Sequence, residues 1–178
     1  MNIDTWLEQI LYAARTPFFV KFFSVLTELG GSIAVAIISI CFAVVWFRQN
    51  RLSYITALFT AVVGSGVVAQ VLKHLVHRPR PSMSAILETG YSFPSGHATA
   101  AFALYGFLTY AIWKMMPLDN RSLWMTLMGT LILLIGFSRL YLGVHYFSDV
   151  VGGYIVGALF VWVGIFVSKR VSTNTQRP

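Results

Sequence analysis

The chain contains, at residues 54–76, the apolar run YITALFTAVVGSGVVAQVLKHLV, whose one charged residue is Lys73 near its end. A helix needs about 20 residues to cross the roughly 30 Å apolar layer of a bilayer, and this run is long enough. Other apolar segments resemble it: Ser32–Phe47, Ala98–Met116, Leu123–Phe137 and Tyr146–Val167. The sequence therefore predicts an all-α integral membrane bundle of about five transmembrane helices.

The composition supports a membrane protein of one domain. Of 178 residues, 57% are hydrophobic and 11% are charged, whereas soluble proteins average roughly 45–50% apolar and about 25% charged residues. The length suits a single domain, residues 1–178. Within it we expect interfacial helices over residues 1–30, the transmembrane bundle over 31–168 and a frayed tail over 169–178.

The N-terminal segment is mixed rather than apolar. Thr5 and Glu8 have the spacing of a capping box, and apolar residues such as Ile10 recur at helical spacing. This pattern predicts an amphipathic helix in the membrane interface. A second short helix is expected from Phe18 to Leu29, before Gly30 and its glycine neighbour break it. No basic, apolar and small-residue pattern of a cleaved signal peptide is present.

The net charge of +7 raises the possibility of nucleic-acid binding. The basic residues lie between apolar segments, however, and do not form a soluble basic face. Membrane topology and an anionic substrate explain the charge better, so no nucleic-acid partner is expected. The lone Cys41 can form neither an intramolecular disulfide nor a thiolate metal site, and its expected role is packing.

Counting the spans places the polar stretches on one face of the membrane. The N-terminal region and the loops 77–93 and 139–145 fall on this face. The turns at 48–53 and 117–121 and the C-terminal tail fall on the opposite face. The polar stretches can therefore form a single site.

The distribution of basic residues predicts the orientation. The face with the turns and the tail carries Arg48, Arg51, Lys114, Arg121, Lys169, Arg170 and Arg177. Apart from candidate site residues, the other face has Arg15, Lys21 and Arg78. By the positive-inside rule the turns are cytoplasmic. We expect a plasma (inner) membrane protein whose site faces the periplasm or the cell exterior.

The first polar stretch, Lys73–Pro81, ends a span and enters a loop. Basic residues at a helix end can simply reach toward lipid head groups. The alternative is phosphate binding, because the planar guanidinium of Arg80 offers paired donors and Lys73 adds a compact charge. Taken alone, this stretch does not decide between the two roles.

The second stretch, Pro94–His97, begins an apolar segment. Ser95 and Gly96 suit an ordinary helix cap, but the free N–H groups of a first helical turn also bind anions. The imidazole of His97 can give a proton to a leaving oxygen near neutral pH. His97 is therefore a candidate general acid.

The third stretch, Ser138–Asp149, contains His145 and Asp149 four residues apart. On a helix these residues share a face, where the carboxylate can hold the imidazole tautomer. The spacing is common and carries little weight alone. A carboxylate near the end of a span nevertheless needs a partner, which His145 supplies.

A zinc site is a competing interpretation of His97, His145 and Asp149, since these are three possible ligands. The basic residues of the same stretches, Lys73, Arg80 and Arg139, would repel a cation and suit a phosphate. No metal and no other cofactor is therefore expected. His74 and His77 are expected to lie outside the site.

Together, the stretches resemble a known family. Six residues separate Lys73 from Arg80-Pro81, and Pro94-Ser95-Gly96-His97 follows; five residues then separate Ser138-Arg139 from His145, and three separate His145 from the aspartate at 149. This pattern is similar to the three-part signature of the type-2 phosphatidic acid phosphatase (PAP2) family, which is related to vanadium haloperoxidases. The resemblance covers Lys73 to Gly157. Many membrane members have six spans, whereas this chain starts with an amphipathic segment.

The resemblance implies hydrolysis of a phosphate ester or diphosphate through a phosphohistidine, without a metal. It makes His145 the nucleophile, Asp149 its orienting carboxylate, and His97 the acid and then the base. The phosphoryl oxygens would be held by Lys73, Arg80, Ser95, Gly96 and Arg139.

The expected substrate is a lipid phosphate, because a site at the mouth of an apolar bundle can be reached from within a leaflet. Undecaprenyl diphosphate is the first expectation; phosphatidylglycerophosphate, phosphatidic acid and lipid A phosphate are alternatives. Two other classes remain open. A transporter would show broken helices or charges at mid-span, and a lipid phosphotransferase would pass the phosphoryl group to another lipid. Neither the lipid tail nor the oligomeric state follows from the sequence.

Overall fold

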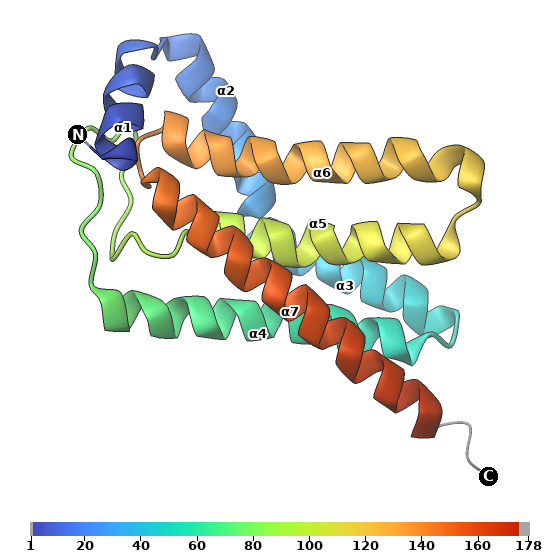
Figure 1. Cartoon of the computed structure of the whole chain (residues 1–178). Coiled ribbons are helices and arrows are strands. Elements are labelled where there is room, and N and C mark those ends of the chain that lie inside the picture. Colours follow the sequence, from blue (N-terminus) through green and yellow to red (C-terminus); the bar gives the residue numbers. More distant parts are fainter. Residues whose placement is uncertain (1, 175–178) are drawn as a thin grey trace.

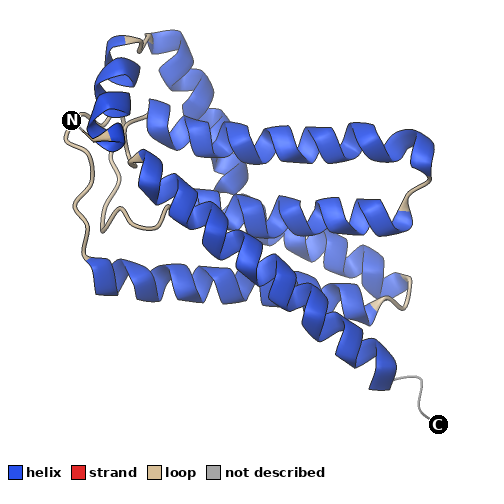
Figure 2. Ribbon diagram, in the orientation of Figure 1, coloured by secondary structure: helices blue, strands red, loops and turns tan. Residues whose placement is uncertain are grey.

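Helices make up the regular structure of the described chain, residues 2–174, in the computed structural model, and no strand occurs in this range (Figures 1 and 2). The elements are α1 (Ile3–Ala13), α2 (Pro17–Thr27), the 3-10 turn η1 (Glu28–Gly30), α3 (Ser32–Arg48), α4 (Leu52–Val76), α5 (Gly96–Met115), α6 (Leu118–Tyr141) and α7 (Phe147–Asn174). The predicted all-α class is confirmed.

Helix α5 lies at the centre of the bundle, where it contacts α3, α4, α6 and α7. Small residues allow these close contacts. A Cβ atom built on Gly153 would lie 2.7 Å from the carbonyl oxygen of Ser95, and one on Gly157 would lie 2.8 Å from that of Thr99. Close helix packing through small residues therefore fixes the start of α5 against the start of α7.

Three helices, α4, α6 and residues 147–170 of α7, are long and apolar enough to cross a membrane. A fourth crossing results if α2–η1 and α3 form one broken span, because these two segments meet at an angle of 44°. Helix α5 is not among these candidates; its side chains are largely buried by its neighbours, so it needs less apolar surface. The membrane bundle is confirmed, and five spans is an approximate count.

Local details differ from two sequence-based predictions. The cap of α1 is Asn2, whose Oδ1 accepts a hydrogen bond of 2.9 Å from the Thr5 N–H, so the predicted capping box at Thr5 is wrong. Helix α7 continues to Asn174, beyond the predicted start of a frayed tail at residue 169. The rest of that tail, 175–178, lies outside the described residues.

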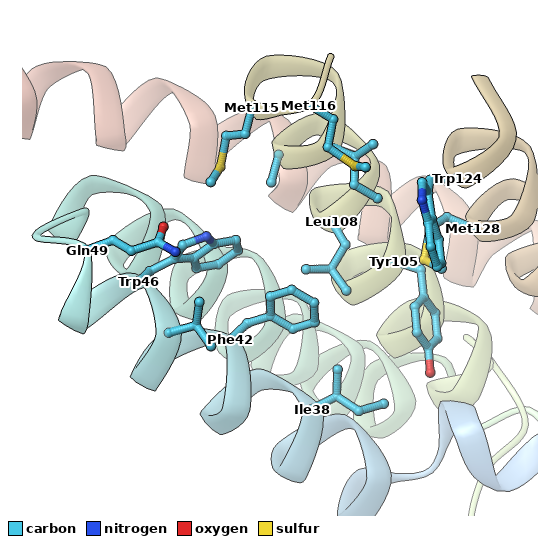
Figure 3. A pocket seen from close by; sticks show the side chains of 13 residues that line it. Ile38, Phe42, Trp46, Gln49, Tyr105, Leu108, Met115, Met116, Trp124 and Met128 are labelled. Atoms are coloured by element: carbon cyan, nitrogen blue, oxygen red, sulfur yellow. The ribbon is translucent and has the colours of Figure 1, made fainter. Parts of the chain in front are cut away.

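The polar stretches gather at one end of the bundle, as predicted. Figure 1 shows the α4–α5 loop, the α6–α7 turn and α1 at this end, while the α3–α4 and α5–α6 turns lie at the opposite end. A cavity of about 380 Å³ opens between α3, α5 and α6 toward that opposite end. Figure 3 shows Phe42, Trp46 and Leu108 among its lining side chains, none of which is acidic, basic or a histidine. Phosphate chemistry must therefore be sought at the polar end.

Candidate active site

A second cavity, of about 340 Å³, lies at the polar end beside the α4–α5 loop. Its lining residues are Gln70, Lys73, His74, Arg80, Glu88, Thr89, Gly90, Tyr91, Gly96, His97 and His145. Five of the sequence-predicted site residues thus meet in one cavity, while Ser95, Arg139 and Asp149 do not line it. We call it the polar pocket.

The imidazole of His145 connects the polar pocket with a buried carboxylate. His145 lies in the α6–α7 turn, just before α7 and not on the helix as predicted. Its Nε2 is 3.2 Å from a guanidinium nitrogen of Arg80. Because an arginine can only donate, Nε2 is the acceptor and the ring proton belongs on Nδ1. Nδ1 is 3.5 Å from Oδ2 of Asp149, a long contact of the kind that catalytic pairs often show before substrate binds.

Asp149 is fully buried in the first turn of α7. Its Oδ2 also accepts a hydrogen bond of 2.9 Å from the backbone N–H of Tyr146, the residue just before the helix. A carboxylate three residues into a helix commonly reaches back to such an N–H group. The helix start therefore orients the Asp149 oxygen toward His145.

Burial lowers the pKa of His145 to about 4, and the positive charges of Arg139 and Arg80 act in the same direction. The nearby carboxylate of Asp149 opposes this shift without cancelling it. The imidazole is therefore neutral at pH 7; Nε2 carries the lone pair that accepts the Arg80 N–H, and this lone pair can attack an electrophile when that contact is released.

Arg80 is held by three backbone carbonyl groups. It donates to the oxygen atoms of Gly90 at 3.0 Å, Thr89 at 3.0 Å and Val144 at 2.9 Å. Lys73, from the last turn of α4, donates to the carbonyl oxygen of Tyr91 at 2.6 Å. These contacts fix two cations beside the polar pocket before any ligand is bound.

Arg139 lies beneath the pocket and is 1% exposed. It donates to the hydroxyl of Thr27 at 3.1 Å and to the carboxylate of Glu88, whose other oxygen is 3.3 Å from Arg80. Burial alone would raise the pKa of Glu88, but the charge and hydrogen bond of Arg139 and the charge of Arg80 lower it below its ordinary value. An ionised carboxylate thus bridges two of the predicted phosphate-binding arginines.

The start of α5 supplies further candidate phosphate ligands. The Ser95 N–H donates to the carbonyl oxygen of Asp149 at 3.0 Å, which ties the two helix starts together. The Ser95 hydroxyl is buried and has no hydrogen-bond partner among the described residues, although buried polar groups rarely stay unpaired. A Cβ atom on Gly96 would meet nothing within 4 Å. His97, one residue further along α5, lines the pocket.

Several neighbours of the site were not predicted from the sequence. His74 lines the polar pocket, so its predicted place outside the site is wrong, whereas His77 does not line it. Glu88 belongs to no motif. It is the sole acidic residue between α4 and α5, and this is the sequence signal that could have identified it. Arg78, treated as part of the surface charge, contacts Asp149 at 2.6 Å.

The ligand arrangement does not favour the zinc interpretation. Within residues 2–174, no three His, Cys, Asp or Glu side chains are placed to hold a metal ion together. The proposed ligands His97, His145 and Asp149 are therefore not arranged as a metal site.

The geometry agrees with the sequence resemblance, and a family model confirms it. The model of the PAP2 superfamily matches residues 53–172. This chain belongs to the PAP2 superfamily. The match includes all eight predicted site residues and every residue that lines the polar pocket. This PAP2 protein is an integral membrane lipid phosphatase, consistent with its relatives.

Curated relatives extend over most of the chain. Phosphatidylglycerophosphatase B of Bacillus subtilis (strain 168) is 31% identical over 99% of this chain and 88% of its own length. Lipid A 4'-phosphatase of Bacteroides thetaiotaomicron is 28% identical over 98% and 81%. Undecaprenyl-diphosphatase of Sulfolobus acidocaldarius is 29% identical over 72% and 59%.

Solved structures share the fold. The transmembrane PAP2-type phosphatidylglycerolphosphate phosphatase from Bacillus subtilis superposes with a TM-score of 0.83 at 26% identity, covering 98% of this chain and 86% of that one. The LpxE protein of Aquifex aeolicus gives a TM-score of 0.76 at 23% identity, covering 93% and 96%, and supports the fold alone.

Proposed function

We propose that this PAP2 phosphatase hydrolyses a glycerophospholipid phosphate monoester of the phosphatidylglycerophosphate type through a phosphohistidine at His145. The observation that carries the proposal is the carboxylate of Glu88 bridging Arg80 and Arg139 beside His145. Two guanidinium groups already hold an oxyanion next to a neutral imidazole. A phosphoryl group can take the place of that carboxylate, because it offers the same kind of acceptor oxygens.

In the first half of the proposed reaction, Nε2 of His145 attacks phosphorus and forms an N–P bond. Burial and the positive charge of Arg139 lower the pKa of His97 to about 3, so His97 takes up its proton when the negative phosphoryl group lies beside it. As the P–O bond to the lipid breaks, His97 gives that proton to the departing oxygen. Asp149 stabilises the positive charge that develops on the His145 ring. In the second half, water attacks phosphorus, its proton passes to His97, and the N–P bond breaks to release inorganic phosphate.

The remaining candidates would hold the phosphoryl oxygens while negative charge spreads over them. We assign this role to Lys73, Arg80, Ser95, Gly96 and Arg139, with Gly96 acting through its backbone N–H. Loss of one such donor typically costs about 2.7–4 kcal/mol of transition-state stabilisation. No step of this sequence requires a metal.

The relatives favour a different substrate from the first sequence-based expectation. The phosphatidylglycerophosphatase of B. subtilis matches nearly the whole chain, whereas the undecaprenyl-diphosphatase of S. acidocaldarius matches 72% of it. We therefore place phosphatidylglycerophosphate before undecaprenyl diphosphate, with phosphatidic acid and lipid A phosphate as competitors. The excess of basic residues at the opposite end of the bundle supports a polar pocket on the outer face of the plasma membrane.

A panel of lipid phosphates tests the substrate. Purified protein in detergent is given phosphatidylglycerophosphate, phosphatidic acid, undecaprenyl diphosphate or lipid A, and released inorganic phosphate is measured with a His145→Ala protein as blank. We expect the highest kcat/KM for phosphatidylglycerophosphate. Equal values across the panel, or a higher value for the diphosphate, would refute the assignment. Transfer to a second lipid without phosphate release would identify a phosphotransferase.

Replacing Glu88 by glutamine should strengthen inhibition by inorganic phosphate. The neutral amide competes less well than a carboxylate for Arg80 and Arg139, and hydrogen bonds to charged groups contribute about 1.5–3 kcal/mol. We expect the inhibition constant for phosphate to fall at least about threefold, measured at constant pH. Asp119→Asn, at the opposite end of the bundle, is the matched control. An unchanged or higher constant in Glu88→Gln would contradict competition between Glu88 and phosphate.

A further inference from the structure

Asp149 has a second partner on the side away from the polar pocket. Its Oδ2 serves His145 and a backbone N–H, whereas its Oδ1 is 2.6 Å from a guanidinium nitrogen of Arg78. The Asp149 side chain is fully buried and that of Arg78 is 27% exposed. The orienting carboxylate is thus held from both sides, by the nucleophile and by a cation that does not line the pocket.

Arg78 is in turn fixed by the N-terminal helix. Its second guanidinium nitrogen is 2.8 Å from Oδ2 of Asp4 in α1, and the first also donates to the hydroxyl of Ser148 at 2.6 Å. Asp4 accepts hydrogen bonds from the N–H of Ser148 at 2.9 Å and from its hydroxyl at 2.6 Å. The guanidinium carbon lies 4.2 Å from the ring centre of Tyr146. Both terminal guanidinium nitrogens of Arg78 are therefore hydrogen-bonded, to Ser148 and Asp149 in α7 and to Asp4 in α1.

Both members of the ion pair are charged at neutral pH. Burial alone would raise the pKa of Asp4, but hydrogen bonds from Ser148 and Arg78 lower it below its ordinary value. Burial alone would lower the pKa of Arg78, but the Asp4 hydrogen bond and the Asp149 charge raise it. The contact is therefore a charge-assisted network and not a neutral one.

We propose that Arg78, held by Asp4 of α1, is a positioning residue for the nucleophile: it fixes the Asp149 carboxylate and thereby the tautomer and direction of the His145 ring. This inference rests on the proposed role of His145. It also gives α1 a function beyond membrane contact, because one cation links this helix to the carboxylate behind the nucleophile.

Loss of Arg78 should alter the chemistry of His145 and not only the stability of the fold. Asp149 would keep a buried charge with one partner fewer, which leaves its orientation less defined. Removing a nearby positive charge also makes Asp149 a better partner for the imidazolium form. The pKa of His145 should therefore rise, and the acid limb of kcat/KM should move to higher pH.

The other charged groups around His145 stay in place in this experiment. They are Arg139 on α6, Arg80 and Glu88 in the α4–α5 loop, His97 on α5, Lys73 on α4, and Glu8 and Asp4 on α1. Asp4 keeps its hydrogen bonds from Ser148 when Arg78 is replaced. A shift of the acid limb can then be assigned to the loss of Arg78.

The test compares Arg78→Gln, Arg78→Lys and Asp4→Asn with the wild-type chain in the same detergent. Loss of a partner that orients a functional histidine commonly costs about 10–100-fold. We expect such a fall in kcat for Arg78→Gln, with KM within about twofold and a shifted acid limb. Arg78→Lys should keep the wild-type acid limb and recover part of kcat, because lysine retains the positive charge but lacks the planar set of guanidinium donors. Asp4→Asn should lower kcat less than Arg78→Gln.

Arg15→Gln is the control for a purely structural effect. Arg15 joins the α1–α2 connection to the carbonyl oxygens of Tyr141, at 2.8 Å, and Met83, but contacts neither Arg78 nor Asp149. We expect it to lower the Tm and to leave the pH profile unchanged. If Arg78→Gln behaves in the same way, the positioning role is wrong.

His145→Ala separates this inference from the proposed function. If that variant still turns over, the nucleophile assignment itself fails. If it is inactive while Arg78→Gln keeps the wild-type kcat and acid limb, only the positioning role fails. Should Arg78→Gln not fold, the same comparison rests on Asp4→Asn, which leaves the Arg78–Asp149 pair in place. A wild-type kcat for Asp4→Asn would then overturn the role of α1.

Discussion

Replacing His145 by alanine is expected to lower phosphate release by about 10,000-fold or more, because loss of a nucleophile or its paired base has effects of this size in other hydrolases. Alanine removes Nε2, the atom that faces Arg80 at 3.2 Å. Without it no N–P bond can form, although the cations that hold the phosphoryl group remain. This variant should therefore still bind the lipid phosphate but not hydrolyse it.

Two measurements check this expectation. Released phosphate is followed with purified phosphatidylglycerophosphate, and the labelled phosphoenzyme is sought after a rapid alkaline quench, since phosphohistidine survives alkali better than acid. His77→Asn is the matched control: it removes a histidine near the site that does not line the polar pocket, and asparagine tolerates the left-handed backbone found there, with φ of 50°. Substantial turnover by His145→Ala at wild-type expression would exclude His145 as the nucleophile.

The sequence predicts those parts of the fold that depend on local composition. A long apolar run such as residues 54–76 must cross or be buried in an apolar medium, so the helix over Leu52–Val76 follows directly. Because successive spans alternate in direction, the N-terminal region, the α4–α5 loop and the α6–α7 turn are all expected at the same end of the bundle. Helix α5 corresponds to the predicted apolar segment Ala98–Met116, but it is not among the helices long and apolar enough to cross a membrane. Its small buried residues, such as Ala101 and Ala103, pack against neighbouring helices.

In the candidate site, too, the residues that follow a sequence pattern could be predicted, whereas those that meet only through the fold are harder to predict. Lys73, Arg80, His97 and His145 could be predicted because their spacing forms a family pattern, and the structure brings them to one pocket. Glu88 belongs to no such spacing, because its bridge joins residues 8 and 51 positions away through a loop without periodicity. Its being the sole acidic residue of that loop is the one sequence signal that marks it.

The link between Arg78 and the N-terminal helix was hidden for a related reason. Arg78 and Asp4 are 74 positions apart, and neither belongs to a repeated or spaced pattern. Ion pairs of this kind depend on how helices dock, which the sequence pattern alone does not specify. The partners of functional residues are therefore less predictable than the functional residues themselves.

Replacing His97 by glutamine should slow both halves of the reaction, and by different amounts for different substrates. General acid–base catalysis typically contributes about 100–10,000-fold, so we expect a loss in this range with a lipid substrate. The fall should be smaller for formation of the phosphoenzyme from p-nitrophenyl phosphate, because its leaving group needs no proton. Hydrolysis of the phosphoenzyme still needs a base to accept a proton from water, and that step should stay slow.

The phosphoenzyme of His97→Gln should therefore accumulate with p-nitrophenyl phosphate. The readout is a burst of nitrophenol, close to one equivalent per active protein, followed by slow turnover, together with labelled protein after an alkaline quench. His74→Gln is the control, because His74 also lines the polar pocket but stands on α4. A burst in both variants would mean that the base is not specifically His97. If His97→Gln shows equal losses with both substrates and no burst, its role lies in binding the phosphoryl group, since proton transfer to the leaving oxygen would have made the loss depend on the leaving group.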